Sequence, residues 1–248
     1  MSSDVRLYVD HPLGAGQTVP LDRDRALYLF AVMRLGVGDR LTLINGRDGA
    51  WSALVAEASK RGGVLAVDAQ TAPQVTPPDL WLMFAPIKKA RTDFIVEKAV
   101  EMGASRILPV VTDYTNERAR QDKLQAHAVE AAEQCGGTFV PPVDPVARLA
   151  AVLDGWGTGA DTTERRILFC DEGLVGQPAD LSGLAPGPWA VLIGPEGGFS
   201  PAERARLQAM PQAQAVSLGP RILRADTAAV AALTLWQVAL GDWRGGHA

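Results

Sequence analysis

Two glycine-rich loops in the last third of the chain, each following a short apolar run, constrain the fold most. The first run, Trp189 to Ile193, leads into Gly-Pro-Glu-Gly-Gly and then into Ser200-Pro201-Ala202-Glu203. A serine N-cap, a proline at the first helical position and a glutamate at the third form a capping box, which predicts a helix over residues 201–210. A second apolar run, 213–218, leads into Gly-Pro-Arg and a last helix predicted over 227–240.

The repeated order of strand, glycine loop and helix predicts parallel neighbouring strands, with both loops at their carboxyl ends and sharing one crevice. Glycines let a backbone approach a ligand closely. Neither loop carries the Gly-Lys-Ser/Thr or G-x-G-x-x-G pattern of phosphate-binding loops, and the carboxylate of Glu196 would repel a phosphate. The crevice therefore favours a nucleoside-like ligand without phosphates, and positive charge on that ligand would suit it.

The same loops carry a family resemblance. LIGPEGGFSPAE (192–203) and LGPRILRADTAA (218–229) closely resemble the two C-terminal motifs of the ribosomal RNA small subunit methyltransferase E family, which belongs to the SPOUT class of S-adenosylmethionine-dependent methyltransferases. Residues 88–110, 130–137 and 34–46 are also similar to that family. The resemblance implies an α/β protein with a small N-terminal PUA-like β-barrel, a C-terminal SPOUT domain with a parallel sheet and a C-terminal trefoil knot, and a homodimer.

The rest of the chain predicts two domains. A strand at 5–10, a helix at 22–34 and β runs at 40–44, 50–58 and 64–68 with hairpin signals between them predict a small barrel over 1–72, and the resemblance implies that this barrel binds RNA. The proline-rich stretch 73–79 predicts a linker. Strands at 80–84, 106–111 and 167–170 and helices at 92–102 and 121–134 complete an α/β layer with a mostly parallel sheet over 80–248, which the resemblance implies is the SPOUT methyltransferase domain. We expect Gly155 to Asp161 to be a flexible connection.

Composition limits the possible partners. The net charge is −4, and residues 1–79 hold eight Lys/Arg against nine Asp/Glu, so any basic RNA-binding surface must be local. Histidines and cysteines lack metal-ligand spacing, which predicts no metal site. The uncharged stretch at the last helix is shorter than the roughly 20 residues of a membrane span. Two cysteines and a charged N-terminus without a signal peptide favour a cytoplasmic protein without membrane contact.

The resemblance implies methyl transfer from S-adenosylmethionine to N3 of a uridine in 16S rRNA of the small ribosomal subunit. Because N3 carries a proton at neutral pH, the enzyme must remove it or stabilise the resulting anion. Arg221 and Arg224 suit the second task, and Glu196 and Asp226 are the nearest candidate bases. The implied donor-binding residues are Ile193, Gly194, Pro195, Glu196, Gly197, Leu218, Gly219, Ile222 and Leu223. The implied RNA-binding residues are Arg34, Lys88, Lys89, Arg91, Asn116, Arg118 and Gln134.

The chain departs from the family pattern at two places. Ala225 and Asp226 stand where the family usually has threonine and glutamate, and Gly137 stands where arginine is common. The second change removes a potential RNA contact and bears on substrate affinity more than on reaction type. Three alternatives stay open: a SPOUT enzyme acting on another RNA, a noncatalytic RNA-binding protein, and an α/β enzyme of a phosphorylated metabolite.

Overall fold

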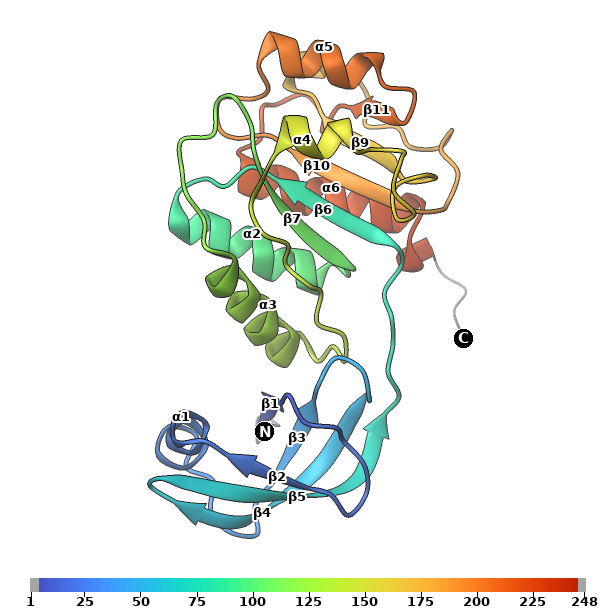
Figure 1. Cartoon of the computed structure of the whole chain (residues 1–248). Helices are drawn as coiled ribbons and strands as arrows, with labels where there is room; N and C mark the ends of the chain where they lie inside the picture. The colour runs from blue at the N-terminus through green and yellow to red at the C-terminus, as the bar shows by residue number, and fades with distance from the viewer. Residues whose placement is uncertain (1–4, 245–248) are drawn as a thin grey trace. The chain divides into compact units, whose positions relative to one another are not determined.

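The computed structural model describes residues 5–244 and divides into two compact units (Figure 1). The N-terminal unit comprises the residues up to Thr76 together with Ala132–Val140, and the C-terminal unit comprises Pro77–Ala131 and the residues from Pro141 onward. The domain limits at 72 and 80 stay a prediction, because the N-terminal unit also takes in a later segment. The outer limits, residues 1 and 248, lie outside the described residues.

A five-stranded sheet forms the N-terminal unit. Its order is β1 (Arg6–Tyr8), β3 (Arg40–Ile44), β4 (Ala50–Ser59), β5 (Gly62–Ala72) and β2 (Thr18–Leu21). β1 pairs with β3 in parallel and the other pairs are antiparallel. Because β1 and β2 are the two edges, the sheet is an open half-barrel. The sequence did not predict β2, since its central Pro20 interrupts the apolar pattern; proline is tolerated on an edge strand.

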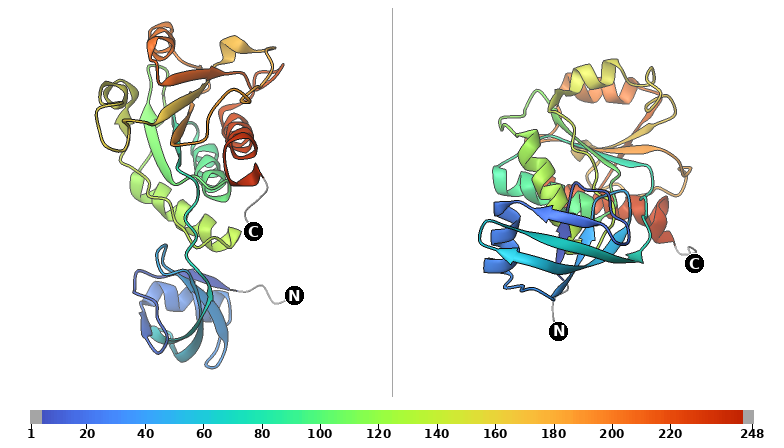
Figure 2. Two further views of the ribbon diagram at one scale, coloured as in Figure 1. Left: turned by 90° about the vertical axis from the view of Figure 1, so that its right-hand side faces the viewer. Right: turned by 60° about the horizontal axis from the view of Figure 1, so that its bottom comes forward.

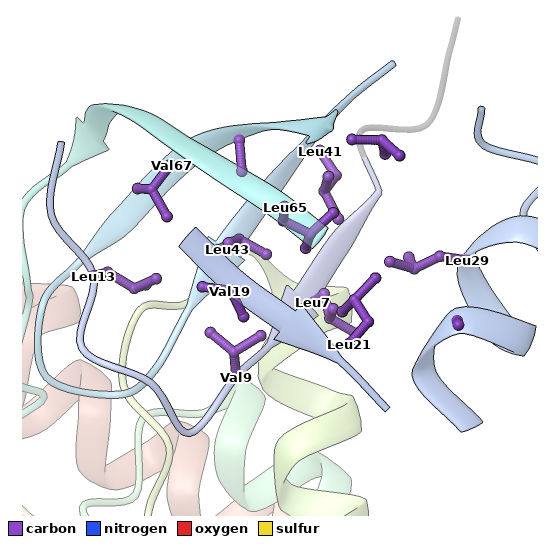
Figure 3. Close-up of a cluster of buried hydrophobic side chains, with 13 residues drawn as sticks. Leu7, Val9, Leu13, Val19, Leu21, Leu29, Leu41, Leu43, Leu65 and Val67 are labelled. Atoms are coloured by element: carbon purple, nitrogen blue, oxygen red, sulfur yellow. The ribbon is translucent and has the colours of Figure 1, made fainter. Parts of the chain in front are cut away.

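The helix predicted at 22–34 forms as a short α1 (Arg23–Ala26) that continues as a π-helical segment, Leu27–Val32. Asp22 caps it by accepting a hydrogen bond from the Arg25 N–H at 2.8 Å. The segment places Leu29 in the core beside the inward side chains of the sheet (Figure 3). The core of this unit consists of Leu7, Val9, Leu13, Val19, Leu21, Ala26, Leu29, Leu41, Leu43, Ala53, Val55, Leu65 and Val67.

A parallel sheet of six strands organises the C-terminal unit. Its order is β11 (Ala213–Val216), β9 (Arg166–Cys170), β10 (Trp189–Ile193), β6 (Leu80–Phe84), β7 (Arg106–Val111) and β8 (Ala147–Arg148). The sequence predicted that β10 and β11, the two strands that precede the glycine loops, would be neighbours. This prediction is wrong, because the two strands do not pair with each other. β9 lies between them, because the chain leaves β10 and returns past β9 before it forms β11.

Helices cover both faces of this sheet (Figure 2). α4 (Leu149–Asp154) and α5 (Pro201–Ala209) pack on the face that carries Trp81 and Met83. α2 (Lys89–Glu101) and α6 (Ala225–Ala239) pack against each other, and the Gln237 Nε2 donates to the Met102 carbonyl at 2.6 Å. Within the described residues, the remaining helices are α3 (Gln121–Cys135) and two short 3-10 turns, Glu172–Leu174 and Asp242–Arg244.

The segment Gly155 to Asp161 is anchored, which corrects the expectation of a flexible connection. Trp156 is buried, meets Trp81 edge-to-face at a centroid distance of 6.2 Å and donates to the Arg165 carbonyl at 3.0 Å. Arg165 lies 3.6 Å from the Trp81 ring centroid and binds both carboxylate oxygens of Asp79 at 2.8 Å. Burial lowers the pKa of this guanidinium, although Asp79 opposes the shift. A single tryptophan among glycines has no periodic pattern that could have predicted this packing.

No helix within residues 5–244 is long and apolar enough to cross a membrane. The trefoil knot stays a prediction, because strand order and register do not establish whether the chain passes through its own loop.

Candidate functional site

A cavity of about 290 Å³ opens at the carboxyl ends of three adjacent strands, β10, β9 and β11. This edge of a parallel sheet is the usual ligand-binding side. The lining residues are 170–172 and 175 at and after the end of β9, 193–196, 198 and 199 at and after the end of β10, and 216–219, 221–225 and 228 from the end of β11 into α6. The two glycine loops therefore share one crevice, as predicted.

The loop after β9 is a third wall that the sequence analysis missed. Asp171 is buried, receives the Gly173 N–H at 2.9 Å and lies 3.2 Å from the Arg204 Nε. Glu172 is 43% exposed at its side chain and also lines the cavity. The available signal was the predicted strand 167–170 followed directly by Asp-Glu-Gly, at the same sheet edge as the glycine loops.

Most of the predicted donor-binding positions line this cavity. Eight of the nine do so, namely Ile193, Gly194, Pro195, Glu196, Leu218, Gly219, Ile222 and Leu223. Gly197 does not, because it faces Tyr114 from the loop after β7. Ile193 is 2% exposed and Ile222 is 72% exposed, so the apolar surface of the cavity includes a buried residue at its floor, Ile193, and an exposed one at its rim, Ile222.

Glycine is required at several points of the loops for different reasons. A Cβ on Gly194 would lie 3.2 Å from the Phe199 ring, so this position needs a close approach. Gly198 has φ +70° and Gly219 has φ +104°, a backbone region that residues with a Cβ rarely adopt. A Cβ on Gly198 would also collide with the Glu172 carboxylate. The loop shape therefore depends on glycines rather than on specific side chains.

The capping box predicted at the start of α5 is confirmed and extends to a neighbouring loop. Ser200 Oγ accepts the Glu203 N–H at 3.2 Å, and Glu203 Oε2 accepts the Ser200 N–H at 2.9 Å. The second oxygen of Glu203 accepts the Asp113 N–H at 2.9 Å, and Ser200 Oγ donates to the Asp113 carboxylate. The first glycine loop is thereby fastened to the loop that follows β7.

Arg91 ties the two glycine loops together. Its Nη1 pairs with Glu196 in the first loop, and its Nε lies 3.7 Å from the Asp226 carboxylate in the first turn of α6. Both candidate bases therefore share one cation. The predicted role of Arg91 toward RNA stays a prediction, and the structure adds this second role, which no sequence spacing indicated.

The two candidate catalytic arginines also line the cavity but, unlike Arg91, form no ion pair among the described residues. Arg221 and Arg224 are exposed, and neither guanidinium has an ion pair with any residue between 5 and 244. α6 begins at Ala225, two residues before the predicted start, so Arg224 is its N-cap residue. The N–H groups of the first turn of α6 add partial positive charge next to Arg224, although the Thr227 N–H is already bound by the Asp226 carboxylate at 2.9 Å. This side of the cavity is suited to a ligand that develops negative charge.

Cys170 also contributes to the lining, but it is not a nucleophile. Burial raises the pKa of its thiol to about 12, so the group stays protonated at neutral pH. Within the described part of the chain, no group of three or more His, Cys, Asp or Glu side chains is arranged to hold a metal ion.

The predicted RNA-binding residues fall in both units. Lys88 and Lys89 open α2, where Lys89 pairs with Asp93 at 2.6 Å, and Asn116 and Arg118 are exposed in the loop after β7. Because β10, β6 and β7 are neighbours, these residues and Arg91 lie at the same sheet edge as the cavity.

Arg34 and Gln134 belong to the N-terminal unit and are exposed. In that unit Arg6 donates to the Gly137 carbonyl at 2.8 Å. Gly137 is the residue that stands where arginine is common in the family.

Comparison with known proteins identifies the family. Residues 75–237 match an RNA methyltransferase domain and residues 21–67 match an RNA methyltransferase PUA domain. The ribosomal RNA small subunit methyltransferase E of Mycobacterium bovis is 30% identical over 249 residues, covering 95% of this chain and 92% of the relative. The protein of the same name from Rickettsia conorii is 27% identical over 233 residues, covering 92% of this chain and 93% of the relative.

A crystal structure of a ribosomal RNA small subunit methyltransferase E from Neisseria gonorrhoeae, bound to S-adenosyl methionine, superposes with a TM-score of 0.83 at 29% identity. The match covers 96% of this chain and 98% of that structure. Both domains and nearly the full length are thus accounted for, and the chain belongs to the ribosomal RNA small subunit methyltransferase E family.

Proposed function

We propose that this enzyme transfers the methyl group of S-adenosylmethionine to N3 of a uridine in 16S rRNA of the small ribosomal subunit. The observation that carries the proposal is the cavity at the carboxyl ends of β9, β10 and β11, where two glycine loops meet two unpaired arginines. Membership of the family and the donor-bound relative from Neisseria gonorrhoeae support the same reaction.

The residues of the cavity fit the donor. S-adenosylmethionine supplies an electrophilic methyl group on a positively charged sulfur. The backbone of residues 194–196, 218 and 219 offers amide and carbonyl groups to a nucleoside, and Ile193, Ile222 and Leu223 offer apolar contact. The carboxylates of Glu172 and Glu196 suit a cationic ligand and oppose a phosphate. An α/β enzyme of a phosphorylated metabolite fits this wall less well.

The arginines perform the task that uracil chemistry demands. A guanidinium is charged at every accessible pH and presents fixed donors, so Arg221 or Arg224 can bind a uracil carbonyl oxygen as negative charge develops on it. Proton removal falls to a carboxylate, and Glu196 and Asp226 stay the candidates. Arg91 holds both of them, so it fixes their positions relative to the two loops.

The partners follow from the same proposal. The N-terminal unit contacts RNA through Arg34 and Gln134. The C-terminal unit does so through Lys88, Lys89, Arg91, Asn116 and Arg118. We further propose a cytoplasmic homodimer with a trefoil knot at the C-terminal loops. Exposed apolar side chains near the end of the chain, Val238 at 57% and Trp243 at 47%, support a covered surface there.

Methyl-labelled S-adenosylmethionine tests the reaction. The protein is incubated with unmodified small subunits and, separately, with large subunits, and labelled RNA is counted. We expect label in the small subunit alone. Arg224→Ala should keep donor affinity, measured by calorimetry, and lower the transfer rate by roughly 100-fold or more, as loss of a charge-stabilising donor does. An unchanged transfer rate in Arg224→Ala would remove Arg224 from the mechanism. Failure of the wild-type protein to bind S-adenosylmethionine would favour a noncatalytic RNA-binding protein.

A further inference from the structure

Tyr114 is an exposed aromatic residue beside the cavity that the reaction above does not use. It lies in the loop after β7, is 45% exposed, and its hydroxyl has no hydrogen-bond partner among residues 5–244. A Cβ placed on Gly197 would lie 3.5 Å from the Tyr114 Cβ and 3.7 Å from its Cδ2. The Cβ end of the Tyr114 side chain therefore lies against Gly197 of the first glycine loop. The two residues that flank Gly197, Glu196 and Gly198, both line the cavity.

The backbone that carries Tyr114 is fixed on both sides. The Thr112 N–H donates to Thr115 Oγ1 at 2.9 Å, and the Thr115 N–H donates to the Thr112 carbonyl at 3.2 Å, which closes a tight turn. Asp113 is held by Glu203 and Ser200 at the start of α5. The ring is therefore presented at a defined place, and a tyrosine loses little conformational entropy when a flat ligand covers it.

The surroundings of Tyr114 suit an unpaired nucleotide. Asn116 and Arg118 follow it on the same loop and are exposed, and Lys88 lies after the neighbouring strand β6. An aromatic ring beside cationic and amide side chains is the combination that binds single-stranded RNA, where bases stack on the ring and phosphates meet the cations.

Methylation at N3 requires such an unpaired nucleotide. N3 lies on the Watson–Crick edge of uracil, so a uridine must leave its base pair and its stack before it can enter the cavity. Extrusion loses stacking energy, and an aromatic side chain at the rim can replace it.

We propose that Tyr114 stacks on an unpaired base of the RNA substrate at the rim of the cavity, and so positions the nucleotides that enter it. The proposal rests on the proposed function, because it takes RNA as the substrate. Tyr114 touches substrate in this arrangement and contributes to RNA affinity rather than to donor affinity.

Substitutions at Tyr114 in the full chain test the inference. Tyr114→Ala should raise the KM for unmodified small subunits roughly 5- to 150-fold, as loss of one base–aromatic stack does, with donor affinity and melting temperature unchanged. Tyr114→Phe should keep the KM within about threefold, because it keeps the ring. Tyr114→Leu should resemble Tyr114→Ala, since it restores apolar size without a π-face. Phe94→Ala is the matched control: Phe94 is 38% exposed and its ring is already covered by Lys98.

The outcomes separate this inference from the proposed function. A wild-type protein that binds the donor but does not label RNA refutes the function, and filter binding of the Tyr114 variants to small subunits without donor still tests the stacking. An unchanged KM and RNA affinity in Tyr114→Ala would overturn the inference. A Leu variant as good as wild type would overturn it too, and so would parallel losses of melting temperature and donor affinity in the Ala variant, because these indicate a structural role.

Discussion

Neighbouring glycines in the first loop should respond oppositely to the same added methyl group. Gly198 has φ +70°, where a residue with a Cβ costs about 1–2 kcal/mol, and its Cβ would collide with the Glu172 carboxylate. The Glu172 side chain is 43% exposed and can swing away, so the backbone term dominates. Gly197 lies outside the left-handed region, and its Cβ would meet Tyr114 at an ordinary 3.5 Å. Gly197→Ala should therefore raise the free energy of unfolding by about 0.4–1 kcal/mol, because alanine lowers the conformational entropy of the unfolded chain.

The free energies of unfolding of the two variants should differ by about 1.5–3 kcal/mol. For a chain of 150–250 residues each kcal/mol shifts the melting temperature by about 2–4 °C, so Gly198→Ala should melt about 3–12 °C below Gly197→Ala. Scanning calorimetry measures this difference, and titration with S-adenosylmethionine should show weaker binding only for Gly198→Ala, because Gly198 lines the cavity and Gly197 faces away from it toward Tyr114. Equal melting temperatures, or a Gly198→Ala protein that is more stable than wild type, would refute the described loop.

Three further predictions follow from the site. Gly219→Val, at φ +104° with no atom within 4 Å of an added Cβ, should lose donor binding but stay folded by circular dichroism, and undiminished donor affinity would contradict the placement of the second loop. A double-mutant cycle of Arg91→Ala and Glu196→Ala should give a coupling of about 0.2–1 kcal/mol in stability, since the pair is partly exposed, and zero coupling would show that Arg91 does not hold this carboxylate. A disulfide reagent at pH 8 should modify exposed Cys135 quickly, while Cys170, which is partly exposed in the cavity but has a thiol pKa of about 12, should react far more slowly because little thiolate forms; two equally fast thiols would contradict the raised pKa.

The buried strands were the most predictable part of the fold. Leu80–Phe84, Arg106–Val111 and Trp189–Ile193 have the same limits in sequence and structure, because each is a largely apolar run with a polar residue, proline or glycine within two residues of either end. The capping box at Ser200 was equally readable, since its residue types act locally. Strand order was not, because apolar runs carry no information about which strands become neighbours, and β9 lies between β10 and β11.

The candidate site divides in the same way. The glycine loops and Arg221 and Arg224 could be found from motifs, because their residue types stand together in the chain. The bridge from Arg91 to Glu196, the contact of Tyr114 with Gly197 and the wall formed by Glu172 join segments that are far apart in sequence. Such contacts depend on which strand ends are adjacent, so only the three-dimensional arrangement reveals them.

Identification of the modified nucleoside tests the central claim most directly. RNA from unmodified small subunits is digested after incubation with the protein and labelled S-adenosylmethionine, and the nucleosides are separated and identified by mass spectrometry. The account predicts that the label appears in N3-methyluridine from 16S rRNA. Label in another nucleoside, or in the ribose, would contradict the assignment of uracil N3 as the acceptor and with it the role given to the two arginines.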